Sequence, residues 1–467
     1  MANKNIGAVD EITAMQASDT VLIETGGSVK RVSPDTLSGR MNLQSNVELN
    51  SYGIEFDTTV SDPSCTRVGN MSLHRTLPIQ SRMRGCILGD DGNVVEYLPQ
   101  GSWLGSTRDG SKGQVMVEIP EHWRRCLTNG TKREVRLAET ALPGFAHVPL
   151  MYVSAYEAAV DRTVTAKPKL CSVVNTTVQF RGGSNNASLD GTAKSQLGLP
   201  ATNLGRNTFR TLARNRKSGS TEWNLYTYEC HKTLYWLFAV EYATLNSQAA
   251  FNAQPTAEGY RQGGLGDGAT GLGWDKWGTF NGTNPVVPCG HTDSLGNGTG
   301  VVEFTMPTEY ETNKKVNVTR YRGIENPFGH INKWVDGILV QVNPGDNGAS
   351  KVYVCGDPAK FKDSIGGGYT YIGDEARGAG FVKEILFGGD GDIMPKSCDG
   401  GSSSTYFCDN HYVRTDNTAV EVRGVLFGGL ASDGSIAGFA DAYSDAAPSA
   451  AYPSIGSRLC FLPSTTA

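Results

Sequence analysis

Acidic side chains gather at two places where their carboxylate oxygens could bind a calcium ion. Asp390, Asp392 and Asp399 lie in one glycine-rich stretch, GGDGDIMPKSCDGG, and residues 90–93 read Asp-Asp-Gly-Asn. A calcium loop of the usual helix–loop–helix type also needs a closing glutamate at a fixed distance, and neither stretch has one. Asp-Asp-Gly-Asn is typical of a plain β-turn. We therefore expect no cofactor, with bound calcium as the alternative.

The sequence lacks the local motifs of common enzyme active sites. No GxSxG, HExxH, P-loop or CxxC motif occurs, so nucleophilic, zinc-dependent and phosphate-binding chemistry have no signature here. His291, His330 and His411 have no near neighbour in the sequence that suggests a catalytic triad. We expect that the protein is not an enzyme.

Ten cysteines are scattered, and only Cys398 and Cys408 lie close together in the sequence. Zinc needs clustered ligands, which this spacing does not predict. The N-terminus, MANKNIGAVDEI, has no apolar signal-peptide core, and no run of about 18 apolar residues occurs. We expect synthesis in a cytoplasm, mostly reduced and buried thiols, and no membrane insertion.

Composition and charge indicate a folded, loop-rich protein without a nucleic-acid partner. Hydrophobic residues make up 39% of the 467 residues, enough for a real core. The 57 glycines stand mostly between short apolar runs, as in folds built from short strands and loops. The formal charge is −5 and no basic run stands out. We expect the α+β class.

Three units are expected along the chain. Residues 1–40 contain two strand-like runs around Gly26-Gly27, which predicts a β-hairpin, and then the start of a short helix at Ser33-Pro34. A unit this short cannot bury enough surface alone and needs partners. Residues 41–100 alternate in short runs and form a β-rich connector. Its expected strands cover residues 47–56, 66–74, 84–88 and 93–97.

The third unit, residues 101–467, should hold short strands, long irregular loops and one buried helix. Residues 222–248 are apolar on nearly all faces in their second half, which predicts that helix. Glu241 inside it is expected to be a paired structural acid, with a catalytic role as the alternative. The pattern of residues 151–162 predicts a strand that runs into a helix, and residues 335–342 predict a strand.

Basic residues accompany a short helical stripe in this unit. Phe209, Leu212 and Ala213 form the apolar side of the stripe. A solvated helix face is the favoured interpretation of the charges, and an anion-binding patch is the alternative. These basic residues are Arg206, Arg210, Arg214, Arg216 and Lys217.

Residues 428–461 consist of a stretch of small and polar residues followed by a short apolar ending. About twenty residues of Ala, Ser, Asp, Gly and Tyr without a steady period precede the apolar ending IGSRLCF. The stretch is too small and polar for a core strand, and Gly and Pro interrupt it too often for a helix. It is expected to be an irregular loop between two strands.

This ending resembles the C-type-lectin-like fold in its formylglycine-generating (sulfatase-modifying) branch. VRGVLFGGL resembles the glycine-marked strand of that family, and IGSRLCF, with Gly456, Arg458 and Leu459, resembles its closing strand. MYVSAYEAAVDR is similar to the family's early strand-to-helix segment, so the resemblance spans residues 115–463. The catalytic branch holds copper with two cysteines near its C-terminus. Here residues 428–461 contain only Cys460, which argues against that oxidase.

Longer stretches resemble virion proteins of phages of Bacteroidales, including the crAss-like group. They are RGGSNNASLDGT, WLFAVEYATLNSQAAFNA, PCGHTDSLGNGTG and YRGIENPFGHINKWVDGI. SDTVLIETGGSVKRVSPDTL is similar to the segments that anchor phage head and tail fibres. The resemblance implies a homotrimeric fibre in the virion that binds other virion proteins through residues 1–40. It leaves attachment to the capsid or to the tail open.

The resemblance also implies that the loop before the closing strand contacts the bacterial surface, through a glycan or a protein receptor. Its Tyr side chains offer rigid contact area and its Ser and Asp side chains offer adaptable hydrogen bonds, as in antibody paratopes. An ordinary surface loop is the bland alternative. The expected contact residues are Ser432, Asp433, Ser435, Phe439, Asp441, Tyr443, Ser444, Asp445 and Tyr452.

Two other functions stay open from the sequence. A bacterial surface adhesin or lectin of the same fold would need export, for which the N-terminus offers no signal. An oxidase of the formylglycine-generating type would need a second copper-binding thiol. Host attachment by a phage fibre is the favoured interpretation.

Overall fold

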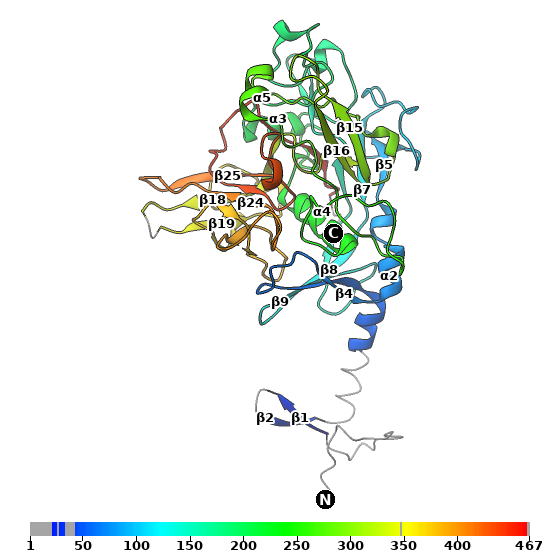
Figure 1. Ribbon diagram of the computed structural model, residues 1–467, viewed down its shortest axis with the longest axis vertical. Coiled ribbons are helices and arrows are strands. Elements are labelled where there is room, and N and C mark those ends of the chain that lie inside the picture. The colour runs from blue at the N-terminus through cyan, green and yellow to red at the C-terminus, as the bar shows by residue number, and fades with distance from the viewer. Residues whose placement is uncertain (1–20, 26–27, 33–42, 346–347, 465–467) are drawn as a thin grey trace, which may run out of the picture.

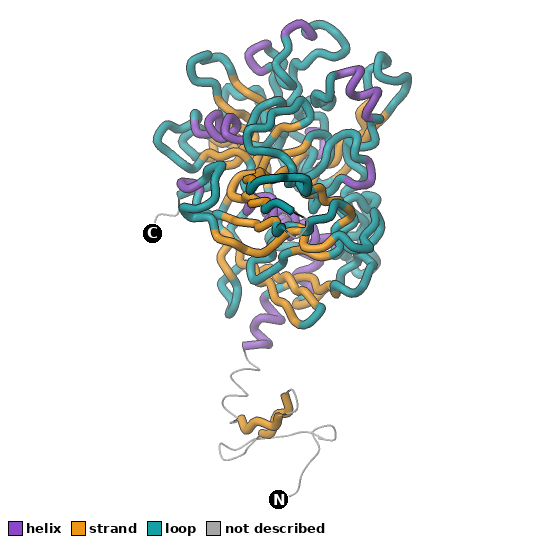
Figure 2. Tube along the Cα trace, turned by 90° about the vertical axis from the view of Figure 1, so that its left-hand side faces the viewer, coloured by secondary structure: helices purple, strands orange, loops and turns teal. Residues whose placement is uncertain are grey.

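The computed structural model describes residues 21–25, 28–32, 43–345 and 348–464. It has about 15% helix and 30% strand, and one of its sheets is curled. Figure 2 shows many short elements joined by long stretches of loop. The expected α+β class with short strands is confirmed.

The N-terminal hairpin forms as the sequence predicts. β1 (Val21–Thr25) pairs antiparallel with β2 (Ser28–Val32), with Val21 opposite Val32. Figure 1 draws this hairpin below the main body. The short helix expected to start at residue 33 lies outside the described residues.

Two sheets combine strands from both sides of residue 101. The five-stranded sheet has the order β10 (Ala146–Val148), β8 (His122–Asn129), β9 (Lys132–Ala138), β3 (Tyr52–Asp57) and β4 (Thr66–Gly69). The six-stranded sheet has the order β14 (Trp223–Leu225), β28 (Leu459–Phe461), β11 (Met151–Ser154), β7 (Gln114–Ile119), β5 (Arg84–Leu88) and β6 (Val94–Tyr97).

The expected boundary at residue 101 therefore falls inside shared sheets and does not separate two units. β3 pairs with β9 and β5 pairs with β7, so residues 43–100 bury their apolar faces against the described part of residues 101–467. The strand expected over residues 47–56 starts only at Tyr52, because residues 43–50 are helical. The turn expected at residues 90–93 joins β5 to β6, and the amide of Gly89 donates to the carbonyl of Asn93.

An eight-stranded sheet carries most of the C-terminal third (Figure 1). Its long strand β18 (Asn332–Val342) contains the strand expected over residues 335–342. The order is β20 (Thr370–Glu375), β19 (Ser350–Val354), β18, β25 (Glu421–Phe427), β26 (Ala442–Tyr443), β24 (Asn410–Tyr412) and β21 (Gly380–Phe381), and β27 (Ile455–Gly456) pairs with β18.

Smaller sheets and further helices complete the described body. The sheets are β12 (Ala159–Asp161) with β13 (Lys169–Cys171), β15 (Gly300–Thr305) with β16 (Lys315–Tyr321) and β17 (Ile324–Glu325), and β22 (Glu384–Ile385) with β23 (Pro395–Ser397). The labelled helices are α2 (Met71–Thr76), α3 (Arg206–Arg214), α4 (Tyr228–Tyr242) and α5 (Trp274–Asn281). No helix among the described residues is long and apolar enough to span a membrane.

Helix α4 is the buried helix that the sequence predicts, and it lies at the centre of the body (Figure 1). The hydroxyl of Thr227 caps its N-terminus by accepting from the amide of Cys230, and Ala243 ends it in a left-handed conformation. Its side chains are buried except Glu229. The chain before Tyr228 is the strand β14, so the helix is shorter than residues 222–248.

Glu241 is a paired structural acid, as expected. Its side chain is 1% exposed and accepts from the Arg322 guanidinium at 2.5 Å and from the Tyr321 hydroxyl at 3.1 Å. Burying a carboxylate is tolerable only when such donors replace its lost water.

The helix expected within residues 151–162 is wrong. Bent, irregular chain follows β11 and leads into β12. Long-range contacts determine this conformation against the local helix propensity. The Ala155 amide donates to the Val115 carbonyl. The Glu157 carboxylate is buried against His330 and Lys333. A helical turn there would withdraw these groups from their partners.

The basic residues around α3 are neither a solvated face nor an open anion patch. The stripe of Phe209, Leu212 and Ala213 is buried as expected. The Arg206 side chain is also fully buried and donates to Asp363 at 2.7 Å, while Arg210 pairs with Asp336 at 2.5 Å. Carboxylates neutralise Arg206 and Arg210, Arg216 is buried, and Arg214 and Lys217 are half-buried, so the expectation of a solvated face is wrong.

Candidate binding groove

Both ends of residues 428–461 are held in sheets. Before the segment, β25 pairs antiparallel with β18. At its end, β28 lies between β11 and β14, and its residues Leu459, Cys460 and Phe461 are buried. The expected firm closing strand is confirmed.

The middle of the segment is not one free loop. Ala442 and Tyr443 form β26, which inserts between β25 and β24 of the eight-stranded sheet. This strand divides the segment into a first turn, residues 428–441, and a second turn, residues 444–454. The expectation of one irregular loop without a core strand is therefore wrong for part of the stretch.

Phe439 shows this most clearly, because its side chain is fully buried. Its ring lies 5.6 Å from the ring of Phe238 on α4 and 5.9 Å from that of Phe328. The aromatic side chains of α4 need a partner on this side, and Phe439 fills the space. Phe439 cannot contact a receptor in this conformation.

Two more expected contact residues are buried. The hydroxyl of Ser444 donates to the buried Glu375 carboxyl at 2.9 Å. Asp441 is 8% exposed, and burial, followed by the charges of Asp433 and Asp409, raises the pKa of its carboxyl well above the usual range. These side chains face the interior of the protein and not the surface.

The remaining expected residues reach the surface to different degrees. Ser435 is exposed, and Ser432 and Asp433 are half-buried in the first turn. The Asp433 carboxylate accepts from the Leu430 amide at 2.8 Å, and burial raises the pKa of this carboxyl to about 6. Tyr452, the one aromatic residue of the second turn, has 57% of its surface accessible.

A groove of about 410 Å³ opens beside the second turn. It brings together Tyr443, Asp445 and Tyr452 of the expected set. Volumes of this order are typical of small-ligand sites. The other lining side chains used below are Trp274 on α5, Arg414 after β24 and Arg423 on β25.

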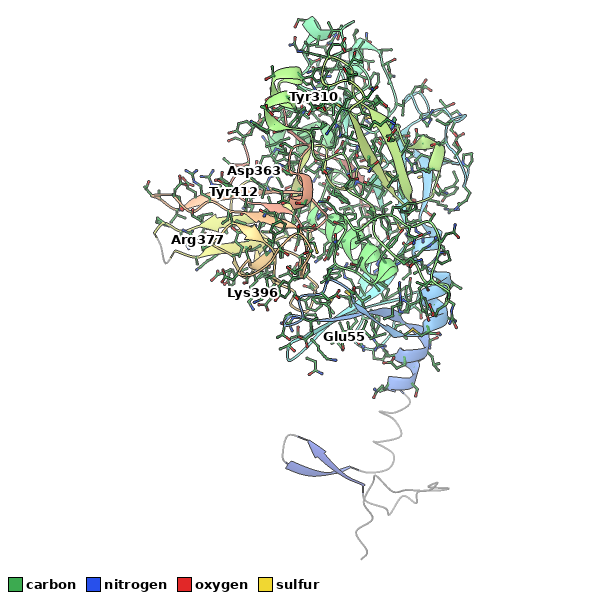
Figure 3. The ribbon with its side chains drawn as sticks, in the orientation of Figure 1. Glu55, Tyr310, Asp363, Arg377, Lys396 and Tyr412 are labelled. Carbon is green, nitrogen blue, oxygen red and sulfur yellow. The ribbon has the colours of Figure 1, made fainter. Side chains whose placement is uncertain are left out.

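The floor of the groove is stiffened by paired tyrosines. Tyr412, labelled in Figure 3, projects from β24, and its ring stacks on that of Tyr443 at 5.1 Å and an angle of 13°. The Tyr443 hydroxyl donates to the Asp445 carboxylate at 3.1 Å. This contact fixes Asp445 at the edge of the groove, where 23% of its side chain is exposed.

The backbone around Tyr452 is held although its side chain is exposed. The Tyr452 carbonyl accepts from the amides of Asn203 and Ile455, at 3.0 and 2.9 Å. A pinned backbone presents the ring at little cost in conformational entropy.

Charges in the groove are close to balance. Arg414 lies 2.8 Å from Asp416 and 3.6 Å from Asp445, and Arg423 pairs with Glu421. Within the described residues, Asp445 Oδ1 accepts no hydrogen bond. The groove therefore offers planar polar groups of both signs without a strong net field.

Sequence reasoning missed Trp274, Arg414 and Arg423. Trp274 lies 169 positions before Tyr443, in the glycine-rich stretch GGLGDGATGLGWDKWGTF. It is 59% exposed, which is unusual for a side chain of this size. Two tryptophans in an otherwise small-residue stretch were the available signal.

The other chemistry-bearing residues lie elsewhere and are engaged. His330 is buried and its Nδ1 lies 2.6 Å from Glu157, while His411 is buried between the carbonyls of Ala376 and Ala442. Asp392 of the acidic stretch is buried and lies 3.4 Å from Lys232. Within the described residues, no group of three or more His, Cys, Asp or Glu side chains gathers as a metal ion requires.

The ten thiols, all within the described residues, are free, as expected. Cys460 is fully buried, and burial, together with its neighbour Cys230, raises the pKa of its thiol well above the usual range. The thiol lies in the core, where β28 pairs with β14.

The sequence was also compared with known proteins. No family model matches the chain, and no curated protein is significantly similar to it.

Proposed function

We propose that the protein is a structural protein of a phage virion, a head or tail fibre, that displays a C-type-lectin-like domain to bind the surface of its bacterial host. Residues 1–40 would attach the fibre to other virion proteins. The fibre would be a homotrimer, because three copies multiply weak surface contacts through avidity.

The lectin-like part of this proposal is supported by how the body closes. The strand that resembles the family's closing strand, β28, pairs antiparallel with β11, the strand that resembles its early segment. Short strands, few helices and a curled sheet accompany this pairing.

The observation that carries host binding is the groove beside the second turn. It is lined by Tyr443, Asp445 and Tyr452, which belong to the segment expected to contact the host. Exposed aromatic side chains held on a fixed backbone are typical of contact sites.

The test is adsorption of the purified full-length protein to a panel of Bacteroidales strains. We expect saturable binding to at least one strain, and loss of at least tenfold in apparent affinity for Tyr452→Ala. Tyr371→Ala is the matched control, since Tyr371 is 49% exposed on β20 and lies away from the groove lining. Absence of binding to every strain would refute host attachment.

Light scattering tests the oligomeric state. We expect a mass of about three chains at micromolar concentration. A monomer would refute the homotrimer without bearing on the groove.

A further inference from the structure

We infer that the groove binds a carbohydrate of the host surface, and that Trp274 on α5 is one of its main contact residues. This inference rests on the proposed function and names the ligand of the same site. It adds a residue that lies outside the segment expected to contact the host.

The aromatic lining fits one face of a sugar ring. Trp274 and Tyr452 are both more than half exposed although they line the groove. The C–H groups on one face of a sugar pack well against aromatic rings, whose faces are electron-rich. Trp274 is also held in place, because its ring packs edge-on against buried Trp277 at 5.8 Å.

The polar lining fits hydroxyl groups. A sugar hydroxyl both donates and accepts, so it pairs best with guanidinium donors beside carboxylate acceptors. Arg414 and Asp445 provide such a pair, 3.6 Å apart, and 33% and 23% of their side chains are exposed. A hydroxyl group that accepts from the Arg414 guanidinium and donates to the exposed part of the Asp445 carboxylate would match this pair.

The charge balance argues against a simple anion as the ligand. Each guanidinium of the lining already has a carboxylate neighbour, Asp416 and Asp445 for Arg414 and Glu421 for Arg423. A site built for phosphate or carboxylate would leave these donors free for bidentate contacts. Neutral, hydroxyl-rich rings suit the arrangement better.

The size of the groove favours a glycan over a protein receptor. Its volume of about 410 Å³ lies in the range of small-molecule sites. Stable protein–protein interfaces usually bury about 1,200 Å² or more, over a much flatter surface. A protein receptor is therefore the outcome that the experiment must exclude.

The experiment uses a strain that binds the full-length protein, with its cells treated in two ways. Periodate cleaves the vicinal diols of sugars, and protease removes surface proteins. We expect periodate to abolish binding and protease to leave it unchanged. Binding that is lost after protease and kept after periodate would overturn the carbohydrate inference, while host attachment would stand.

If both treatments abolish binding, a competition assay distinguishes the two kinds of receptor. Its competitor is protein-free polysaccharide extracted from the same cells. Competition by this extract supports a glycan carried on a protein. Failure of the extract to compete overturns the inference. If no strain binds the protein at all, the proposed function falls, and this inference falls with it.

Variants test the part of Trp274. We expect Trp274→Ala to weaken binding to the extract at least tenfold, and Trp274→Phe to restore part of that loss. Tyr371→Ala again serves as the control with unchanged binding. Because Trp274 is mostly exposed, the melting temperature should change little, and unchanged binding of folded Trp274→Ala would refute its role.

Discussion

Replacing Phe439 by alanine tests whether the first turn of residues 428–441 belongs to the core. The ring is fully buried among Phe238, Phe328 and Tyr321. Truncation of a buried phenylalanine costs about 3–5 kcal/mol, from lost burial and from the cavity that remains. We therefore expect Phe439→Ala to be strongly destabilising, although it lies in a stretch of small and polar residues.

The expected change in melting temperature follows from the size of the body. Unfolding entropy near 60 °C is about 2.1 cal/mol/K per residue, or about 0.9 kcal/mol/K for about 420 residues that unfold together. A loss of 3–5 kcal/mol then lowers the melting temperature by about 3–6 °C.

Calorimetry measures this change, with Ser435→Ala as the control from the same turn. Ser435 is exposed, so its variant should change stability by less than about 0.5 kcal/mol. Equal melting temperatures for wild type and Phe439→Ala would refute the placement of this turn in the core.

Three further predictions concern buried charges and thiols. Glu241→Ala leaves Arg322 without its carboxylate and should lower the free energy of unfolding by about 3 kcal/mol, measured by urea denaturation. The control Glu303→Ala removes an exposed pair with Lys315 and should lower it by less than about 1 kcal/mol. Equal losses in the two variants would contradict the buried pairing. Burial raises the pKa of Asp433 to about 6, above about 3.9 in the unfolded chain, so the folded state binds this proton more tightly. Stability should therefore fall as pH rises from about 4 to 6, and Asp433→Asn should make this fall smaller in melts at pH 4.5 and 7, whereas an equal fall in both proteins would contradict it. A reductant should not change the melting temperature of the protein. Alkylation of the folded protein should modify Cys65 and Cys398 first, since the other eight thiols are buried. A mass of the unreduced protein that is lower by two hydrogens per bridge would show disulfides instead.

Elements fixed by local pattern were predictable from the sequence. Helix α4 was predictable because it is apolar on nearly all faces. The hairpin of β1 and β2 was predictable because two glycines separate its strands in the sequence. The closing strand β28 was also predictable from its apolar residues.

Elements whose conformation depends on residues far away in the sequence were not predictable. Residues 155–158 follow β11 as bent, irregular chain because Val115, His330 and Lys333 hold their polar groups. Phe439 looked like part of a surface loop because its partner Phe238 lies about 200 positions earlier.

The groove shows the same limit. Tyr443, Asp445 and Tyr452 were expected from their composition and from the family resemblance. Trp274 joins them only because the fold brings α5 beside the second turn. No local pattern in a single sequence indicates a contact between residues so far apart in the chain.

Hydrogen exchange of the full-length protein, with and without extracted host polysaccharide, tests the groove as the contact site most directly. We predict that binding slows exchange in residues 270–280 and 443–455 and leaves β19 and β20 unchanged. Slowed exchange confined to other surfaces, with none in those two stretches, would contradict the account.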